Sequence, residues 1–140
     1  MEIEKRKITT AEYTRMRALV GWRQIDTEAA QIALKNSLFS VVALENNELI
    51  GFGRVIGDGG VYYYVQDLIV NPIYQNKGVG EALVGEIMEF IHVNTKPGSF
   101  IGLMAAKGLS EYYKKFSFEI RDLDSPGMYQ IVKQKNGFNK

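Results

Sequence analysis

A strand pattern gives way to a helix pattern across residues 61–93, and a glycine-containing loop joins the two. Residues 61–70 are rich in β-branched and aromatic side chains, which favour a strand, and Pro72 ends that strand. The loop reads Gln-Asn-Lys-Gly-Val-Gly over residues 75–80. From residue 78 to residue 93, apolar side chains recur every four residues, which predicts an amphipathic helix; they are Val79, Leu83, Ile87 and Ile91.

Glycines at the start of a helix leave backbone N–H groups open to a ligand. The first four N–H groups have no intrahelical partner and the helix dipole adds partial positive charge, so together they suit a phosphate or pyrophosphate. On its own, the loop is equally compatible with a tight turn. It is not a P-loop, because no Lys-Ser/Thr pair follows Gly80. It is not the dinucleotide fingerprint either, because the third glycine is missing and an antiparallel strand precedes it.

The rest of the chain predicts a mixed sheet with helices on both faces, of α/β or α+β type, in a single domain over residues 1–140. Two helices are expected within residues 8–36, the first with a capping box between Thr9 or Thr10 and Glu12, the second capped by Asp26. The expected strands and remaining helix follow in this order: three antiparallel strands at 38–44, 49–56 and 61–70, a strand at 100–104 parallel to the third, a helix at 108–116, and late strands at 118–120 and 128–132.

The composition limits the classes of protein. Lys and Arg number 17 and Asp and Glu 16, a net charge of +1, whereas a nucleic-acid-binding protein is usually far more basic. Cysteine is absent and His92 is the single histidine, which argues against disulfides, cysteine nucleophiles and metal sites. The N-terminus has no signal-peptide pattern, and no stretch approaches the ~20 apolar residues of a membrane span. We therefore expect a cytoplasmic protein without a metal and without nucleic-acid or membrane partners.

The loop and its flanks resemble the cofactor motif of the GNAT superfamily of N-acetyltransferases, Gln/Arg-x-x-Gly-x-Gly/Ala between a strand and a helix. Gln75, Gly78 and Gly80 match that motif, and Leu68-x-Val70-x-Pro72 before it is also typical. The order of elements is similar over nearly the whole chain. The resemblance implies a central mixed, mostly antiparallel sheet in which two parallel strands, at 61–70 and 99–104, splay apart.

The resemblance also implies acetyl-CoA as the co-substrate. Backbone N–H groups of residues 76–81 would hold the pyrophosphate, with the charge of Lys77 nearby. The edge of residues 68–70 would bind the pantetheine arm as another strand would, and one N–H in this region would polarise the thioester carbonyl. The expected cofactor-binding residues are Leu68, Ile69, Val70, Gln75, Asn76, Lys77, Gly78, Val79, Gly80, Glu81, Ser110 and Tyr113.

Tyr113 is the candidate general acid. It matches the tyrosine of the family's Tyr-x-x-x-Gly-Phe ending, and a phenol is protonated at neutral pH, so it can donate a proton to the departing thiolate of CoA. The alternative is that Tyr113 only packs against the sheet. Two positions depart from the family pattern: Ser117 replaces the glycine, and Ala106 stands where many relatives carry a cofactor-binding Asn, a contact that Ser110 could supply.

Asp67 is the candidate general base or anchor for a cationic substrate, because some small-amine acetyltransferases of the family keep an acidic residue there. The alternative is that Asp67 satisfies backbone groups or pairs with Arg54.

The resemblance implies an acyltransferase that moves an acetyl group to a primary amine by direct attack, and the small size favours a small-molecule acceptor. Protein N-termini and lysines remain possible acceptors. A non-catalytic acyl-CoA-binding or sensory domain of the same fold is the alternative from another class, and a homodimer is expected only by analogy.

Overall fold

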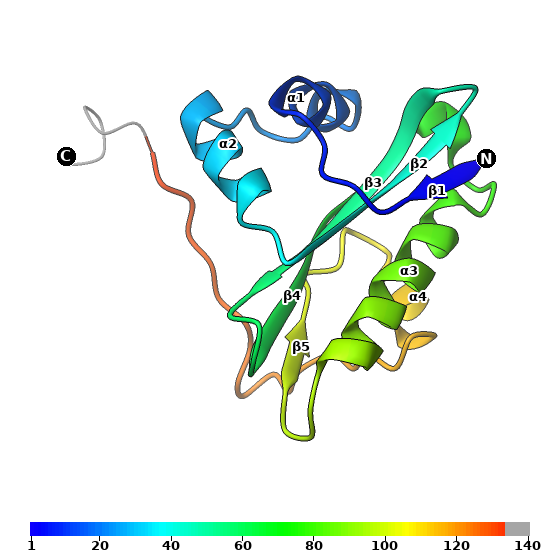
Figure 1. Ribbon diagram of the computed structural model, residues 1–140. Helices are drawn as coiled ribbons and strands as arrows, with labels where there is room; N and C mark the ends of the chain where they lie inside the picture. Colours follow the sequence, from blue (N-terminus) through cyan, green and yellow to red (C-terminus); the bar gives the residue numbers. More distant parts are fainter. Residues whose placement is uncertain (134–140) are drawn as a thin grey trace. The chain divides into compact units, whose positions relative to one another are not determined.

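The computed structural model describes residues 1–133 of the chain. It divides into two compact units, Met1–Met104 and Ala105–Lys140. The first unit holds a five-stranded sheet and three α-helices, and the described part of the second unit, up to residue 133, holds one short helix (Figure 1).

The sheet has the strand order β1-β2-β3-β4-β5. The first four strands pair antiparallel, and β5 pairs parallel with β4. This arrangement confirms the predicted mixed, mostly antiparallel sheet with one parallel pair. The strands of the sheet are β1 (Glu2–Glu4), β2 (Phe39–Glu45), β3 (Glu48–Gly57), β4 (Tyr62–Val70) and β5 (Phe100–Gly102).

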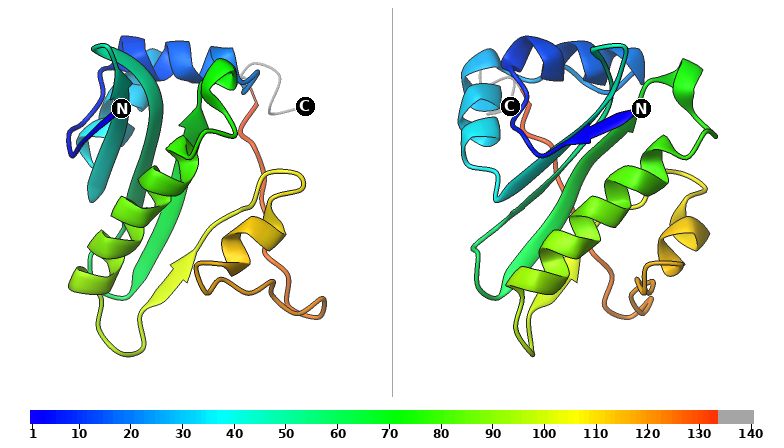
Figure 2. Two further views of the ribbon diagram at one scale, coloured as in Figure 1. Left: turned by 90° about the vertical axis from the view of Figure 1, so that its right-hand side faces the viewer. Right: turned by 45° about the vertical axis from the view of Figure 1, so that its right-hand side comes forward.

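The helices of the first unit cover both faces of the sheet, as Figures 1 and 2 show. On one face, α3 (Val79–Asn94) packs against β2, β3 and β4. On the other face, α1 (Thr10–Leu19) and α2 (Thr27–Lys35) enclose an apolar core with the sheet. The fully buried side chains at the centre of that core include Met16 and Phe52.

Local signals in the sequence explain where the two N-terminal helices begin. Thr9 and Glu12 form the predicted capping box: the Thr9 hydroxyl accepts from the Glu12 N–H, and the Glu12 carboxylate accepts from the Thr9 N–H. The Asp26 carboxylate accepts from the Ala29 N–H at 3.0 Å and caps α2. Both predicted helices are therefore confirmed.

A β-bulge interrupts β4 next to its C-terminal end. Phe52 of β3 pairs with Ile69, whereas Arg54 pairs with Gln66, so two residues of β4 lie opposite Gly53 alone. The first of these two, Asp67, has φ = 58°. The bulge changes which face the side chains occupy.

The side-chain contacts on either side of the bulge show this change of face. Before the bulge, the Tyr63 hydroxyl donates to the Asn94 carbonyl of α3. After it, Asp67 contacts α1 and Ile69 belongs to the core under α1 and α2. Odd-numbered side chains of β4 therefore face opposite layers before and after the bulge.

The second unit differs from the sequence prediction. Its helix, α4 (Ser110–Lys114), is confirmed, but residues 118–120 and 128–132 do not form the predicted strands. A strand requires a partner for its backbone groups, and in the described residues these segments have none; Met128 and Tyr129 are 86% and 77% exposed. The prediction relied on β-favouring residues and on a turn signal at residues 124–127, and it was wrong here. It also missed β1, which is only three residues long.

Candidate functional site

The connection from β4 to α3 is held by its own side chains. After β4, a short 3-10 helix, η1 (Pro72–Tyr74), begins at Asn71, whose side chain accepts from the Ile73 N–H at 3.2 Å. The Gln75 side-chain amide then donates to the Val70 carbonyl at 3.1 Å. Gln75, the first residue of the predicted motif, therefore fixes the loop against the end of the strand.

Helix α3 begins with open backbone. Its N-cap is Gly78, in the left-handed conformation at φ = 85°, and no side chain caps the helix. Because a Cβ is strained at this φ, the backbone itself explains the glycine. Residues 75–78 are exposed, and the Lys77 ammonium lies 5.7 Å from the centre of the Tyr74 ring.

Gly80 has a different explanation. Its φ is not in the left-handed region, and an added Cβ would lie 3.7 Å from Val70 Cγ2, an ordinary contact. Neither the backbone nor the packing of the described residues requires glycine at this position. Without a side chain at residue 80, the backbone of the first turn of α3 is not covered at this position.

In the part of the chain that the structure describes, the β4 edge that faces away from β3 has a strand partner along only part of its length. The pairing with β5 covers only Tyr62–Tyr64, which lie opposite Phe100–Gly102. Among the described residues no strand continues this pairing along residues 65–70, the stretch with the predicted pantetheine-binding residues Leu68, Ile69 and Val70. This short pairing matches the predicted separation of the two parallel strands.

Asp67 lies on the other side of the bulge, in a buried polar cluster. Its Oδ2 accepts from the Tyr13 hydroxyl at 2.6 Å and from Arg54 Nε at 2.8 Å. Its Oδ1 accepts from the Gln66 side-chain amide at 3.1 Å and from Arg17 Nη1 at 3.4 Å. We call these five residues the Asp67 cluster.

The Asp67 cluster is almost closed to solvent: the side chains of Arg17, Arg54 and Asp67 are 6%, 8% and 1% exposed. Burial raises the pKa of the Tyr13 hydroxyl, and the neighbouring Asp67 carboxylate raises it further, so Tyr13 stays a donor at neutral pH. The pairing with Arg54 was the alternative that the sequence left open.

Sequence reasoning missed Tyr13 and Arg17 as partners. They lie four residues apart on the buried face of α1, on either side of Met16. An arginine on an otherwise apolar face needs an acceptor, and that signal was available.

Tyr113 lies in the second unit, at the end of α4, and is 7% exposed. Burial raises the pKa of its hydroxyl, and the adjacent Tyr112 contributes in the same direction. A phenol in this environment stays protonated at neutral pH, which is the state that a general acid needs. Ser110, the other predicted residue of this unit, is the first residue of α4.

The turn after Tyr113 is a Schellman motif. The N–H groups of Phe118 and Ser117 donate to the carbonyls of Tyr113 and Lys114, and the rings of Phe118 and Tyr113 lie 6.2 Å apart. Ser117 has φ = 71° and takes the position that glycine usually occupies. The replacement of the family's glycine therefore leaves the turn intact.

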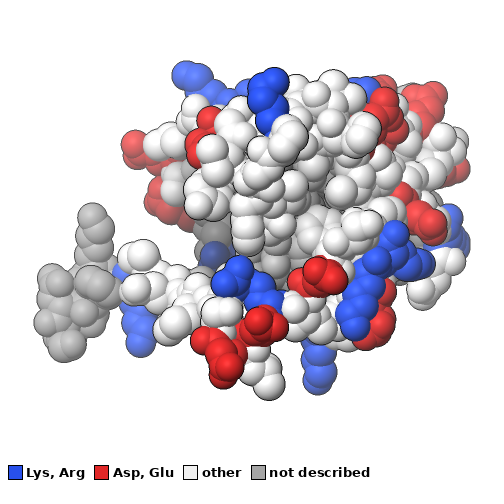
Figure 3. Space-filling model, turned by 90° about the horizontal axis from the view of Figure 1, so that it is seen from below, with Lys and Arg blue, Asp and Glu red and all other residues white. Residues whose placement is uncertain are grey.

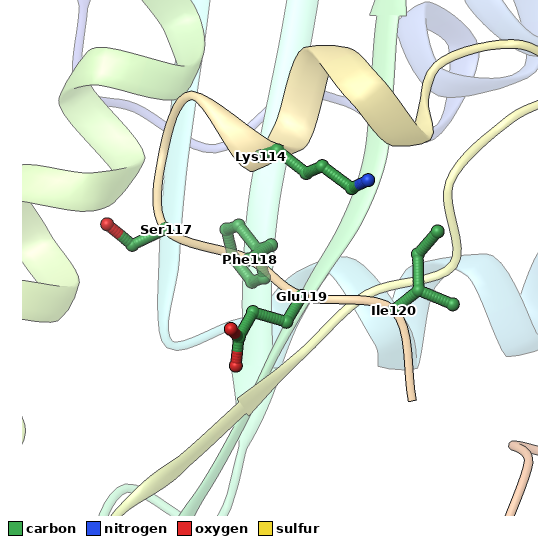
Figure 4. Close-up of a pocket in the computed structure, with 5 residues that line it drawn as sticks. All are labelled: Lys114, Ser117, Phe118, Glu119 and Ile120. Carbon is green, nitrogen blue, oxygen red and sulfur yellow. The ribbon is translucent and has the colours of Figure 1, made fainter. Parts of the chain in front are cut away.

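A shallow pocket lies in the second unit, and Figure 4 shows the side chains that line it. It contains none of the predicted site residues. All its lining residues come from one short stretch of chain: Lys114, Ser117, Phe118, Glu119 and Ile120.

Charged residues of both signs are interspersed on the face seen in Figure 3. Within residues 1–133, no group of three or more His, Cys, Asp or Glu side chains could hold a metal ion. In the same part of the chain, no helix has the length and apolar character needed to cross a membrane.

Comparison with known proteins identifies the family. Residues 10–125 match the family model described as an acetyltransferase (GNAT) domain. The chain belongs to this GNAT family. The prediction of an acyltransferase, made from the loop motif, the residues before it and the order of elements together, is thereby confirmed at the level of the family.

Solved structures agree with this assignment. A Staphylococcus aureus protein described as a "Probable Acetyltransferase" is 32% identical and has a TM-score of 0.88, with 94% of this chain and 98% of that chain covered. A GNAT family acetyltransferase from Streptococcus pneumoniae is 29% identical with a TM-score of 0.76, covering 95% of this chain and 98% of that one.

Curated relatives are longer than the matched region. The uncharacterized N-acetyltransferase ycf52 of Pyropia yezoensis is 30% identical over 115 residues, which cover 79% of this chain and 64% of the relative. The chain therefore spans less than two thirds of that relative's length.

Proposed function

We propose that this chain transfers an acetyl group from acetyl-CoA to the nitrogen of a primary amine. The observation that carries the proposal is the uncapped start of α3 at Gly78, which follows β4, a strand whose edge beyond Tyr64 lacks a strand partner in the described residues. Open helix amides suit a pyrophosphate, and a free strand edge suits the peptide-like pantetheine arm. Coenzyme A is also the ligand named for a structural neighbour, an aminoglycoside 6'-N-acetyltransferase.

The proposed reaction is direct transfer. The neutral amine attacks the thioester carbonyl carbon, the C–N bond forms and the C–S bond breaks. The leaving thiolate takes a proton from the Tyr113 phenol, and the proton lost by the attacking amine passes through water and restores the phenol. An enzyme thiol is not needed, which fits a chain without cysteine.

The first candidate acceptor is a small-molecule amine. A protein acceptor is the second candidate, because the histone acetyltransferase TAP1 of Glycine max is 30% identical over 122 residues, covering 79% of this chain and 52% of that protein.

The remaining expectations are part of the same proposal. We propose one catalytic domain over residues 1–140, assembly as a homodimer, and neither nucleic-acid nor membrane partners. The cytoplasm is the proposed location, although one relative, from Arabidopsis thaliana, is named as chloroplastic and is 30% identical over 122 residues.

The test is thiol release from acetyl-CoA with a panel of acceptors: amino sugars, arylalkylamines, polyamines and lysine-containing peptides. The chain has no cysteine, so a thiol reagent detects only CoA. Release that depends on one amine class supports transfer and identifies the acceptor. Tight CoA binding without release for any amine would instead support the binding or sensory alternative.

Two substitutions at one position test the cofactor site. Gly80→Glu places bulk and negative charge at the first turn of α3, so it should abolish measurable CoA binding in calorimetry. Gly80→Ala is the matched control, because its Cβ meets Val70 at an ordinary distance of 3.7 Å, and it should leave folding unchanged. If Gly80→Glu binds CoA as tightly as the unmodified protein, the cofactor lies elsewhere.

A further inference from the structure

The bulge in β4 depends on an unfavourable backbone conformation. Asp67 has φ = 58°, a region in which the Cβ of an L-residue crowds the backbone and which Asp tolerates better than most residues. In a strand, such a residue persists only where its surroundings hold it. The side chain of Asp67 is the part of this residue with the most contacts.

All four acceptor positions of the Asp67 carboxylate are in use. Each oxygen of an ionised carboxylate offers about two lone-pair sites. Oδ1 accepts from Arg17 and Gln66, and Oδ2 accepts from Tyr13 and Arg54. With a side chain 1% exposed, Asp67 has neither a free lone pair nor an open path for the proton of a substrate amine. This geometry argues against the predicted role of general base.

The donors of the Asp67 cluster are themselves anchored. Arg17 Nε and Nη2 both donate to the Arg23 carbonyl, at 3.0 and 2.8 Å, in the loop between α1 and α2. Arg54 Nη1 donates to the Ser37 hydroxyl at 3.2 Å, directly after α2. Through Arg17 and Arg54, the Asp67 carboxylate therefore links the bulge of β4 to α1, to β3 and to the segments before and after α2.

The bulge lies directly before the backbone that the proposed function uses. Leu68 is the second bulge residue, and Ile69 and Val70 follow it to the end of β4. A bulge rotates the following residues of its strand and sets the direction of their N–H and C=O groups. A substitution of Asp67 should therefore change the direction of the backbone N–H and C=O groups of residues 68–70.

We infer that Asp67 is a positioning residue: held by Tyr13, Arg17 and Arg54, it fixes the bulge of β4 and so directs the backbone of residues 68–70 toward the pantetheine arm. This inference rests on the proposed function for the identity of the ligand. Asp67 thereby has a geometric role in place of proton transfer. Arg54, which cannot act as a base, has the same geometric role.

The experiment compares Asp67→Asn with Arg54→Met, because each breaks the same contact from a different strand. Thr9→Ala is the matched control: it removes the side-chain cap of α1 and lowers stability, whereas the Thr9 backbone carbonyl that accepts from the Tyr13 N–H is kept. For each variant, calorimetry measures the Kd for CoA at a temperature where circular dichroism shows it folded. NMR measures the cross-strand contact between Phe52 and Ile69.

Positioning predicts that Asp67→Asn and Arg54→Met both weaken CoA binding by about tenfold and both alter the Phe52–Ile69 contact. Thr9→Ala should do neither, and the pH profile of acetyl transfer should keep its shape in Arg54→Met and in Asp67→Asn. Unchanged Kd values in both folded variants would overturn the inference and leave a purely structural role.

A base role would give a different result: Asp67→Asn would lose turnover and the acidic limb of its pH profile, with CoA affinity intact and Arg54→Met normal. That result would also overturn the inference. Failure of the proposed function is separate, because the unmodified protein would then bind no CoA at all, while the NMR contact would still report whether Asp67 holds the bulge.

Discussion

Replacing Ser117 by glycine should stabilise the second unit. Ser117 occupies the left-handed position of the Schellman motif at φ = 71°, its side chain is exposed, and in the described residues its hydroxyl makes no hydrogen bond. A left-handed conformation costs a residue with a Cβ about 1–2 kcal/mol, and glycine avoids this cost. Glycine loses more backbone freedom on folding than serine does, and this loss reduces the gain by about 0.5–1 kcal/mol. The net gain should be about 0.5–1 kcal/mol.

Thermal unfolding and amide exchange measure this gain. For a chain of this size, about 1 kcal/mol corresponds to a rise in Tm of about 2–4 °C. Exchange of the Phe118 N–H, which donates to the Tyr113 carbonyl at 3.3 Å, should slow by about fivefold if the gain is about 1 kcal/mol. If the second unit unfolds separately, the shift should appear only in its own transition.

Ser125→Gly is the matched control. Ser125 lies in the same unit, also exposed, but without a positive φ. Glycine there should give no gain, because only the entropic cost applies. An unchanged or lower Tm for Ser117→Gly would show that the serine backbone is not strained and would refute this reasoning.

Three further changes test other parts of the structure. Gly57→Ala should destabilise the protein by more than about 2 kcal/mol in denaturant unfolding, because the new Cβ would lie 2.1 Å from the Tyr62 carbonyl oxygen; an equal midpoint would contradict this. The hydrogen bond from Arg6 lowers the pKa of Glu12. This carboxylate therefore stabilises the fold above its unfolded pKa and loses that contribution as the pH falls through its folded pKa. Glu12→Gln should flatten the acid side of a stability–pH curve, and an unchanged slope would count against the Arg6–Glu12 pair. Tyr113→Phe should lower the rate of acetyl transfer by about 10² or more with little change in CoA affinity, and a rate equal to that of the unmodified protein would exclude Tyr113 as the acid.

The sequence predicted most of the first unit because its signals there are local. The capping box at Thr9 and Glu12, the Asp26 cap and the four-residue spacing of apolar side chains in α3 each depend on neighbours within one or two turns. The glycine motif likewise lies within six consecutive residues, 75–80, at the start of α3. Such features form in place, and the structure has them where the sequence predicted them.

The errors arose where pairing between distant segments decides the structure. Residues 128–132 have the composition of a strand, but no partner strand exists for them among the described residues. In the candidate site, the pairing of Asp67 with Arg54 could be foreseen as an alternative, whereas Arg17 reaches the same carboxylate across 50 positions of sequence. Neither composition nor periodicity indicates a contact between residues so far apart in the sequence.

The bulge in β4 has a consequence for how this strand can evolve. The side chains of Tyr63, Val65, Asp67 and Ile69 are all buried and alternate without interruption. They nevertheless divide between two separate layers, two of them beneath α3 and two beneath α1 and α2. A mutation in one pair should therefore not be compensated by changes in the helices that cover the other pair. Deleting a single residue at 67 or 68 would exchange the two layers for every position on one side, so a change in the length of this strand should disrupt the fold more than a substitution of any one of its side chains.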